Sequence, residues 1–235
     1  MTLPESAGVD VDSLDVLRRL SGKRMLAPAG PRCDMCGTPT TDEHSHVVDL
    51  HNRGLLCTCR PCALLFTDAG AHQRYRTVPD RRLALPLENF TAQDWDRLQL
   101  PVGLVFFFEN SDLGRTLAFY PGPAGVTESE LPLEAWNEIV AANPELGEAR
   151  ADIEAVIMRA GRGGGFECCL VPIDACYELA GRLRSVWRGF DGGTDAHACI
   201  DEFFARNRGT SKSAGLPEPA GVAGSAQQTA PRGVS

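Results

Sequence analysis

The sequence has almost no lysine and no long apolar run. Lys23 and Lys212 are the only lysines among 235 residues, and the formal net charge is -8. Binding to nucleic acid requires clustered basic side chains that displace counterions from the phosphates, so this acidic total argues against it. The apolar stretch 102–108 is far shorter than the roughly 18 residues of a membrane span, so no membrane association is expected.

A recognisable secretory signal is also missing. Residues 1–10 are acidic and lack a basic start followed by an apolar core, which predicts a cytoplasmic protein. Thiols stay reduced in that compartment, so the nine cysteines are not expected to form disulfides. Five of them lie within residues 33–62, and this clustering indicates a metal site.

The composition, with 43% hydrophobic and 23% charged residues, is typical of a globular protein with a sizeable core. Changes in pattern along the chain predict four parts. We expect an N-terminal helix and linker over residues 1–30, a four-cysteine module over 31–80, an α+β domain over 90–206 and a disordered tail over 209–235. The tail lacks aromatic residues, so it cannot bury enough surface to offset its ordering entropy.

The α+β domain is predicted from two similar strand-strand-helix units. In the first unit, strands over 102–108 and 116–120 precede a proline-glycine loop at 121–123 and a helix over 133–142. In the second, strands over 153–159 and 167–171 flank a glycine turn and precede a helix over 174–188, for which Asp174 is the expected N-cap. The two units should form one sheet covered by helices.

Two CxxC pairs form the strongest motif. Cys33 and Cys36 are separated by 22 residues from Cys59 and Cys62, and two such turns supply four thiolates for one tetrahedral ion. A knuckle at the first pair, a hairpin between the pairs and a helix after the second pair are the layout of a treble-clef zinc finger. We therefore predict a structural zinc site and no enzyme activity, because four thiolates leave no open position for a substrate.

Several alternatives stay open at this site. Four cysteines also bind iron in rubredoxin-like proteins, although Ala63 stands here in place of the glycine usual after the second pair. Cys57 and the nearby histidines are candidates for alternative ligands or for donors to the bound sulfurs, namely His44, His46 and His51. A patch of arginines near the cysteines keeps nucleic-acid binding open as a third alternative: Arg53, Arg60, Arg74, Arg76, Arg81 and Arg82. Cys168, Cys169, Cys176 and Cys199 lack metal spacing and are expected in the core.

The pattern over about residues 30–206 resembles an uncharacterised actinobacterial family. The resemblance rests on six stretches: Cys33–Gly37, His46–Leu50, Leu55–Phe66, Tyr120–Ser129, Val171–Leu179 and Trp187–Gly193. Members of that family are often encoded beside nickel-iron hydrogenase genes. The resemblance implies a protein partner, either a hydrogenase subunit or a maturation factor. It leaves open an iron-loaded redox carrier for the same system and a zinc-finger regulator that binds nucleic acid.

Overall fold

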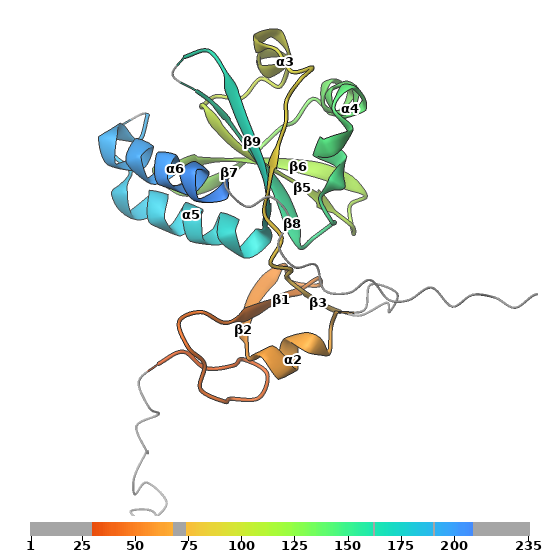
Figure 1. Ribbon diagram of the computed structural model, residues 1–235, viewed down its shortest axis with the longest axis vertical. Helices are drawn as coiled ribbons and strands as arrows, with labels where there is room; N and C mark the ends of the chain where they lie inside the picture. Colours follow the sequence, from red (N-terminus) through yellow and green to blue (C-terminus); the bar gives the residue numbers. More distant parts are fainter. Residues whose placement is uncertain (1–29, 68–73, 162, 190, 209–235) are drawn as a thin grey trace, which may run out of the picture.

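Two antiparallel sheets organise the chain in the computed structural model, which describes residues 30–67, 74–161, 163–189 and 191–208. The smaller sheet belongs to the cysteine-rich module, and the larger sheet belongs to the domain that follows it (Figure 1). The predicted helix at the N-terminus and the predicted disordered tail over 209–235 lie outside the described residues. Within the described part of the chain, no helix has the length and apolar character needed to cross a membrane.

The smaller sheet contains the predicted hairpin. Strands β1 (Ser45–Asp49) and β2 (Gly54–Thr58) pair from Ser45↔Thr58 to Asp49↔Gly54, and β3 (Tyr75–Thr77) pairs with the other edge of β1. Helix α2 (Arg60–Leu64) follows β2 directly. It begins within the second cysteine pair and not after it as expected, and the proline in its first turn has a backbone angle already suited to a helix.

The larger sheet has six strands in the order β4-β9-β8-β5-β6-β7, all antiparallel, and the α+β prediction is confirmed. The strands are β4 (Leu83–Leu85), β5 (Leu104–Asn110), β6 (Arg115–Gly122), β7 (Gly125–Ser129), β8 (Glu154–Ala160) and β9 (Phe166–Pro172). The helical segments are α3 (Ala92–Arg97), α4 (Leu133–Ala142), the 3₁₀-helix η1 (Pro144–Glu148), α5 (Ile173–Val186) and α6 (Gly193–Asn207).

Helices cover both faces of this sheet. Helices α5 and α6 lie over one face, and α3 and α4 lie over the other (Figure 1). Phe106 and Ile157 belong to the buried cluster that includes α5 and α6, whereas Phe107 and Met158 belong to the buried cluster on the other face. Successive side chains of a strand alternate between the two faces, so a sheet covered on both faces needs continuous apolar strands. This requirement explains why β5 and β8 are apolar at consecutive positions.

The first unit has one more strand than the sequence suggested. Of the residues expected to form a loop at 121–123, Pro121 and Gly122 instead end β6, whereas Pro123 lies in the turn. Gly122 pairs with Gly125 at the start of the unpredicted strand β7. Gly125 has φ 118°, a conformation that glycine adopts without steric cost and that permits this tight turn. Strand β4 was also missed, and it lies between the ranges predicted for the module and the domain.

The cysteine-rich module packs on the N-terminal half of α5. Val48 of β1 and Val78 after β3 belong to the same buried cluster as Leu179 of α5. The Tyr177 hydroxyl donates a hydrogen bond of 3.4 Å to the Arg53 carbonyl. Apolar and polar contacts therefore join the two parts of the chain at the first turns of α5.

Candidate metal centre

The first cysteine pair lies in a tight knuckle. The Gly37 amide donates to the Cys33 carbonyl at 2.8 Å, and the Cys33 amide donates to the Thr38 carbonyl at 2.9 Å. Gly37 has φ 73°, in the left-handed region that glycine favours. The glycine after the CxxC pair thus closes the turn that presents both sulfurs on one side.

The second cysteine pair lies at the beginning of a helix. Cys59 is the N-cap of α2, and Cys62 lies within the first turn. The Ala63 amide donates to the Cys59 carbonyl at 3.0 Å, which begins the helical hydrogen bonding. A knuckle and a helix start therefore supply two sulfurs each, as the treble-clef layout predicts.

The structure brings the four predicted ligands together. The Sγ atoms of Cys33, Cys36, Cys59 and Cys62 lie within 4.8 Å of one another. The Cys36 and Cys59 sulfurs are 3.7 Å apart, too far for a disulfide bond of about 2.05 Å. A tetrahedral ion with metal–sulfur bonds of about 2.3 Å holds its sulfurs about 3.8 Å apart. The geometry is therefore compatible with one bound metal ion.

The thiols differ in their affinity for protons. Burial raises the pKa of Cys33, but the backbone amides of Cys59, Cys36 and Met35 outweigh it and lower that pKa to about 6. The neighbouring thiols of Cys59 and Cys36 raise the pKa of Cys62 to about 12. Four thiolates this close repel one another, so the complete set loses its protons only when a cation neutralises the charge.

The four candidate alternative ligands lie outside this group of sulfurs. His44, His46 and Cys57 form a separate cluster, in which one ligand atom of each lies within 4.8 Å of the others. His51 lies in the exposed hairpin turn, where its amide donates to Asp49 Oδ1 at 3.1 Å. Three of the four thus gather at a second place in the module, and His51 does not join them.

Sequence reasoning missed the role of Asp174. It is not the N-cap of α5, because the helix begins one residue earlier, at Ile173, with Pro172 as its N-cap. The Asp174 carboxylate instead contacts His46, with Oδ2 2.8 Å from Nδ1. The two residues are 128 positions apart, and no local pattern in the sequence signals such a contact.

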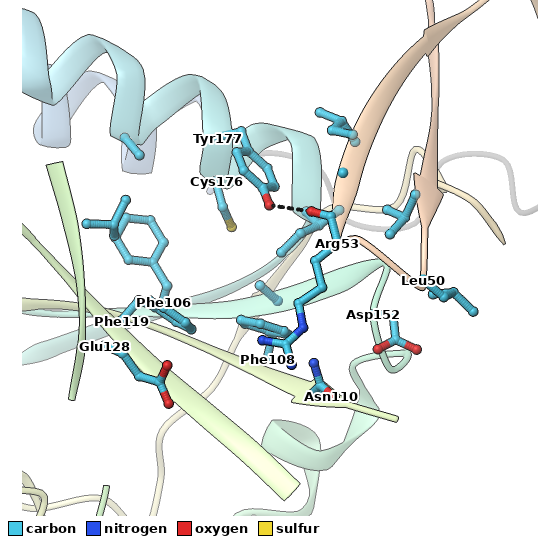
Figure 2. A pocket seen from close by; sticks show the side chains of 17 residues that line it. Leu50, Arg53, Phe106, Phe108, Asn110, Phe119, Glu128, Asp152, Cys176 and Tyr177 are labelled. Carbon is cyan, nitrogen blue, oxygen red and sulfur yellow. Dashed lines mark hydrogen bonds between the residues drawn. The ribbon is translucent and has the colours of Figure 1, made fainter. Parts of the chain in front are cut away.

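A cavity of about 410 Å³ lies between the hairpin and the larger sheet. Aromatic side chains form much of its wall, including Phe106, Phe108 and Phe119, and the Arg53 side chain reaches toward Phe108 and Asn110 (Figure 2). Glu128 of the unpredicted strand β7 also lines it. The volume and the mixture of apolar walls with few polar groups are typical of small-molecule pockets.

The remaining cysteines are buried in the core of the larger domain, as expected. Burial raises the pKa of the Cys168 thiol well above its ordinary value and that of Cys169 to about 12. Such thiols stay protonated at neutral pH and are poor metal ligands or nucleophiles.

The comparison with family models agrees with the expectation that the chain belongs to an uncharacterised family. A model described as "Family of unknown function (DUF5947)" matches residues 32–211, which include the four clustered cysteines and the whole larger sheet. The comparison with curated proteins finds no match, and the comparison with solved structures finds none.

Proposed function

The chain belongs to the DUF5947 family of unknown function, and from this premise we propose that it is a non-enzymatic accessory protein whose four cysteines bind zinc. The observation that carries the proposal is the convergence of four sulfurs from a knuckle and a helix start. A closed shell of four thiolates supplies folding energy to a small module and leaves no position for a substrate.

The environment of the second cysteine pair favours zinc over iron. Rubredoxin-like iron sites are formed by two similar knuckles, each followed by a glycine. Here Cys62 lies inside α2 and is followed by the buried Ala63, so the two halves of the site differ. This asymmetry is typical of treble-clef zinc modules.

Two exposed leucines support a protein partner. Leu64 and Leu65 follow the buried Ala63 and are 49% and 67% exposed. The metal site holds the short helix that presents them, so the ion would keep an apolar recognition surface in shape. We propose a hydrogenase subunit or maturation factor as the partner, because the resemblance places such proteins beside hydrogenase genes.

The arginines near the module favour a protein partner over nucleic acid. Arg74 bonds Asp49 at 2.6 Å, and Arg81 bonds Glu154 at 2.9 Å. Arg76 lies 3.4 Å from Asp152. Arginines committed to internal carboxylates are less available for phosphates, and the net charge of -8 repels a nucleic-acid backbone.

Metal analysis tests the proposal. The full chain should be purified without added metal, followed by elemental analysis and a visible spectrum. We expect colourless protein with zinc at the four cysteines. A red protein that contains iron would contradict the zinc assignment and favour the redox carrier.

The partner is tested separately by co-purification from the native host. A hydrogenase component should accompany the wild-type chain and be reduced in a Leu64→Ser/Leu65→Ser variant that retains its metal. Recovery of the chain with no hydrogenase component would contradict the assigned partner.

A further inference from the structure

A second group of metal-ligating side chains lies on the hairpin. His44, His46 and Cys57, which we call the His–Cys cluster, are each partly buried, and one ligand atom of each lies within 4.8 Å of the others. The two imidazole rings are 4.7 Å apart between centroids and tilted by 53°. His46 and Cys57 are direct cross-strand partners in β1 and β2, so the antiparallel register places their side chains on the same face.

Hydrogen bonds set the tautomer of His46. Its Nδ1 lies 2.8 Å from Asp174 Oδ2, and a carboxylate oxygen can only accept a hydrogen bond. Nδ1 therefore carries a proton, and in the neutral ring the lone pair is on Nε2. A carboxylate that holds one ring nitrogen while the other binds a metal is the usual outer-sphere arrangement of histidine ligands.

His44 has the same tautomer for an independent reason. Its Nδ1 lies 2.9 Å from the Thr41 carbonyl oxygen and 3.1 Å from the Asp42 carbonyl oxygen, and both are acceptors. The Nε2 lone pair is buried and has no hydrogen-bond partner in the described part of the chain. A buried acceptor without a partner costs about 1–3 kcal/mol. A metal ion bound to this nitrogen would remove that cost.

We propose that the His–Cys cluster binds a second metal ion, zinc, through Nε2 of His44, Nε2 of His46 and Sγ of Cys57. Two imidazoles and a thiolate are a donor set that zinc favours, and three protein ligands leave a fourth position for water. Asp174 is a positioning residue: it orients His46 and belongs to α5. The second ion would therefore stabilise the contact between the cysteine-rich module, which supplies its ligands, and α5 of the larger domain, which supplies Asp174.

The ordinary alternative is an ion pair between protonated His46 and Asp174 without a metal. It would explain the contact between these two residues. It would leave Nε2 of His44 buried without a partner, and it would also leave Asp174 Oδ1, which is buried and has no partner among the described residues. A metal dication bound to both imidazoles would use Nε2 of His44 as a ligand, and its charge would offset the negative charge of the Asp174 carboxylate.

Metal stoichiometry and zinc-edge X-ray absorption of the full chain test the proposal. Two ions per chain are expected, with nitrogen scatterers at about 2.0–2.1 Å beside sulfur at about 2.3 Å. His44→Ala and Cys57→Ser should each retain one ion, and its shell should contain sulfur alone. Asp174→Asn should lower the affinity for the second ion about 10–100-fold, as measured by competition with a chelator.

Matched variants separate this proposal from the four-cysteine site. His51→Ala, which removes the exposed histidine of the same hairpin, should retain both ions. A first ion that proves to be iron would overturn the zinc assignment above and leave the second site intact. One ion per chain with sulfur ligands alone in the wild type would overturn the His–Cys site. So would loss of all metal in Cys57→Ser, because Cys57 would then belong to the first site.

Discussion

Asp34 and Cys57 exchange two hydrogen bonds. The Asp34 amide donates to the Cys57 carbonyl at 2.7 Å, and the Cys57 amide donates to Asp34 Oδ2 at 2.7 Å. Asp34 lies inside the first CxxC pair, whereas Cys57 is near the end of β2, two residues before the second pair. This reciprocal contact joins the two halves of the candidate metal centre without involving any of the four clustered sulfurs.

Asp34→Ala should therefore loosen the four-cysteine site although it removes no sulfur. Loss of a hydrogen bond to a charged acceptor costs about 1.5–3 kcal/mol, and we expect a faster transfer of metal to a chelator together with a lower free energy of unfolding. Asp34→Asn keeps an acceptor oxygen and should retain most of the wild-type behaviour. Equal metal transfer rates for the alanine variant and the wild type would contradict a role for this contact.

The identity of the four ligands can be tested by single serine variants. Cys36→Ser and Cys59→Ser should each lose the metal of the four-cysteine site, because a tetrahedral shell needs all four thiolates. Cys57→Ser should keep that metal, since the Cys57 sulfur lies in the other cluster. Metal content by elemental analysis gives the answer, and the reverse pattern would show that the ligand register is shifted.

The difference between what the sequence predicts and what it misses follows from distance along the chain. The knuckle, the hairpin and α4 are predictable because cysteine spacing, alternation and helical periodicity are local. Strand β7 was not predicted because a proline-glycine run precedes it, and such runs usually indicate a loop, although the backbone here pairs as a strand. Strand β4 was not predicted because it has only three residues. The contact between His46 and Asp174 depends on how the module docks on α5, which no local pattern encodes.

Metal binding to the four cysteines should release fewer than four protons at pH 7. The lowered pKa of Cys33, about 6, makes it mostly thiolate at that pH, whereas the raised pKa of Cys62, about 12, keeps its proton until a cation displaces it. As the pH falls through 6, Cys33 gains a proton as well, so the affinity should decline more steeply. Calorimetry of Cys57→Ser in buffers of different ionisation enthalpy measures the number for this site alone. Release of four protons at pH 7 would show that the site is not preformed.

Trp136 should be a major source of stability for the α4 face of the sheet. It is 4% exposed and stacks on Phe107 with ring centroids 4.0 Å apart, and its Nε1 donates to Thr116 Oγ1 at 3.2 Å. Trp136→Ala should cost about 3–5 kcal/mol through the cavity it leaves. Trp136→Phe retains an aromatic ring and should cost less. Urea unfolding followed by far-ultraviolet circular dichroism compares them, and equal losses would argue against the stacking contribution.

The ion pair between Arg81 and Glu154 should matter most when only one partner is removed. Glu154 is fully buried in β8, and its carboxylate accepts from Arg81 Nε and Nη2, both at 2.9 Å, and from the Arg150 amide at 2.9 Å. Arg81→Met leaves that carboxylate without its cation, and breaking a buried pair in this way costs about 3–5 kcal/mol.

The double variant Arg81→Met/Glu154→Gln removes the stranded charge and keeps an acceptor for the Arg150 amide, so it should be more stable than Arg81→Met alone. Arg115→Met is the control, because Arg115 lies 3.7 Å from Glu128, both side chains are half exposed, and such surface pairs contribute at most about 1 kcal/mol. Urea unfolding of the three variants decides the matter. If the double variant is the least stable of the three, the cost of Arg81→Met arises from lost packing of the arginine stem, since neutralising the carboxylate would then bring no recovery.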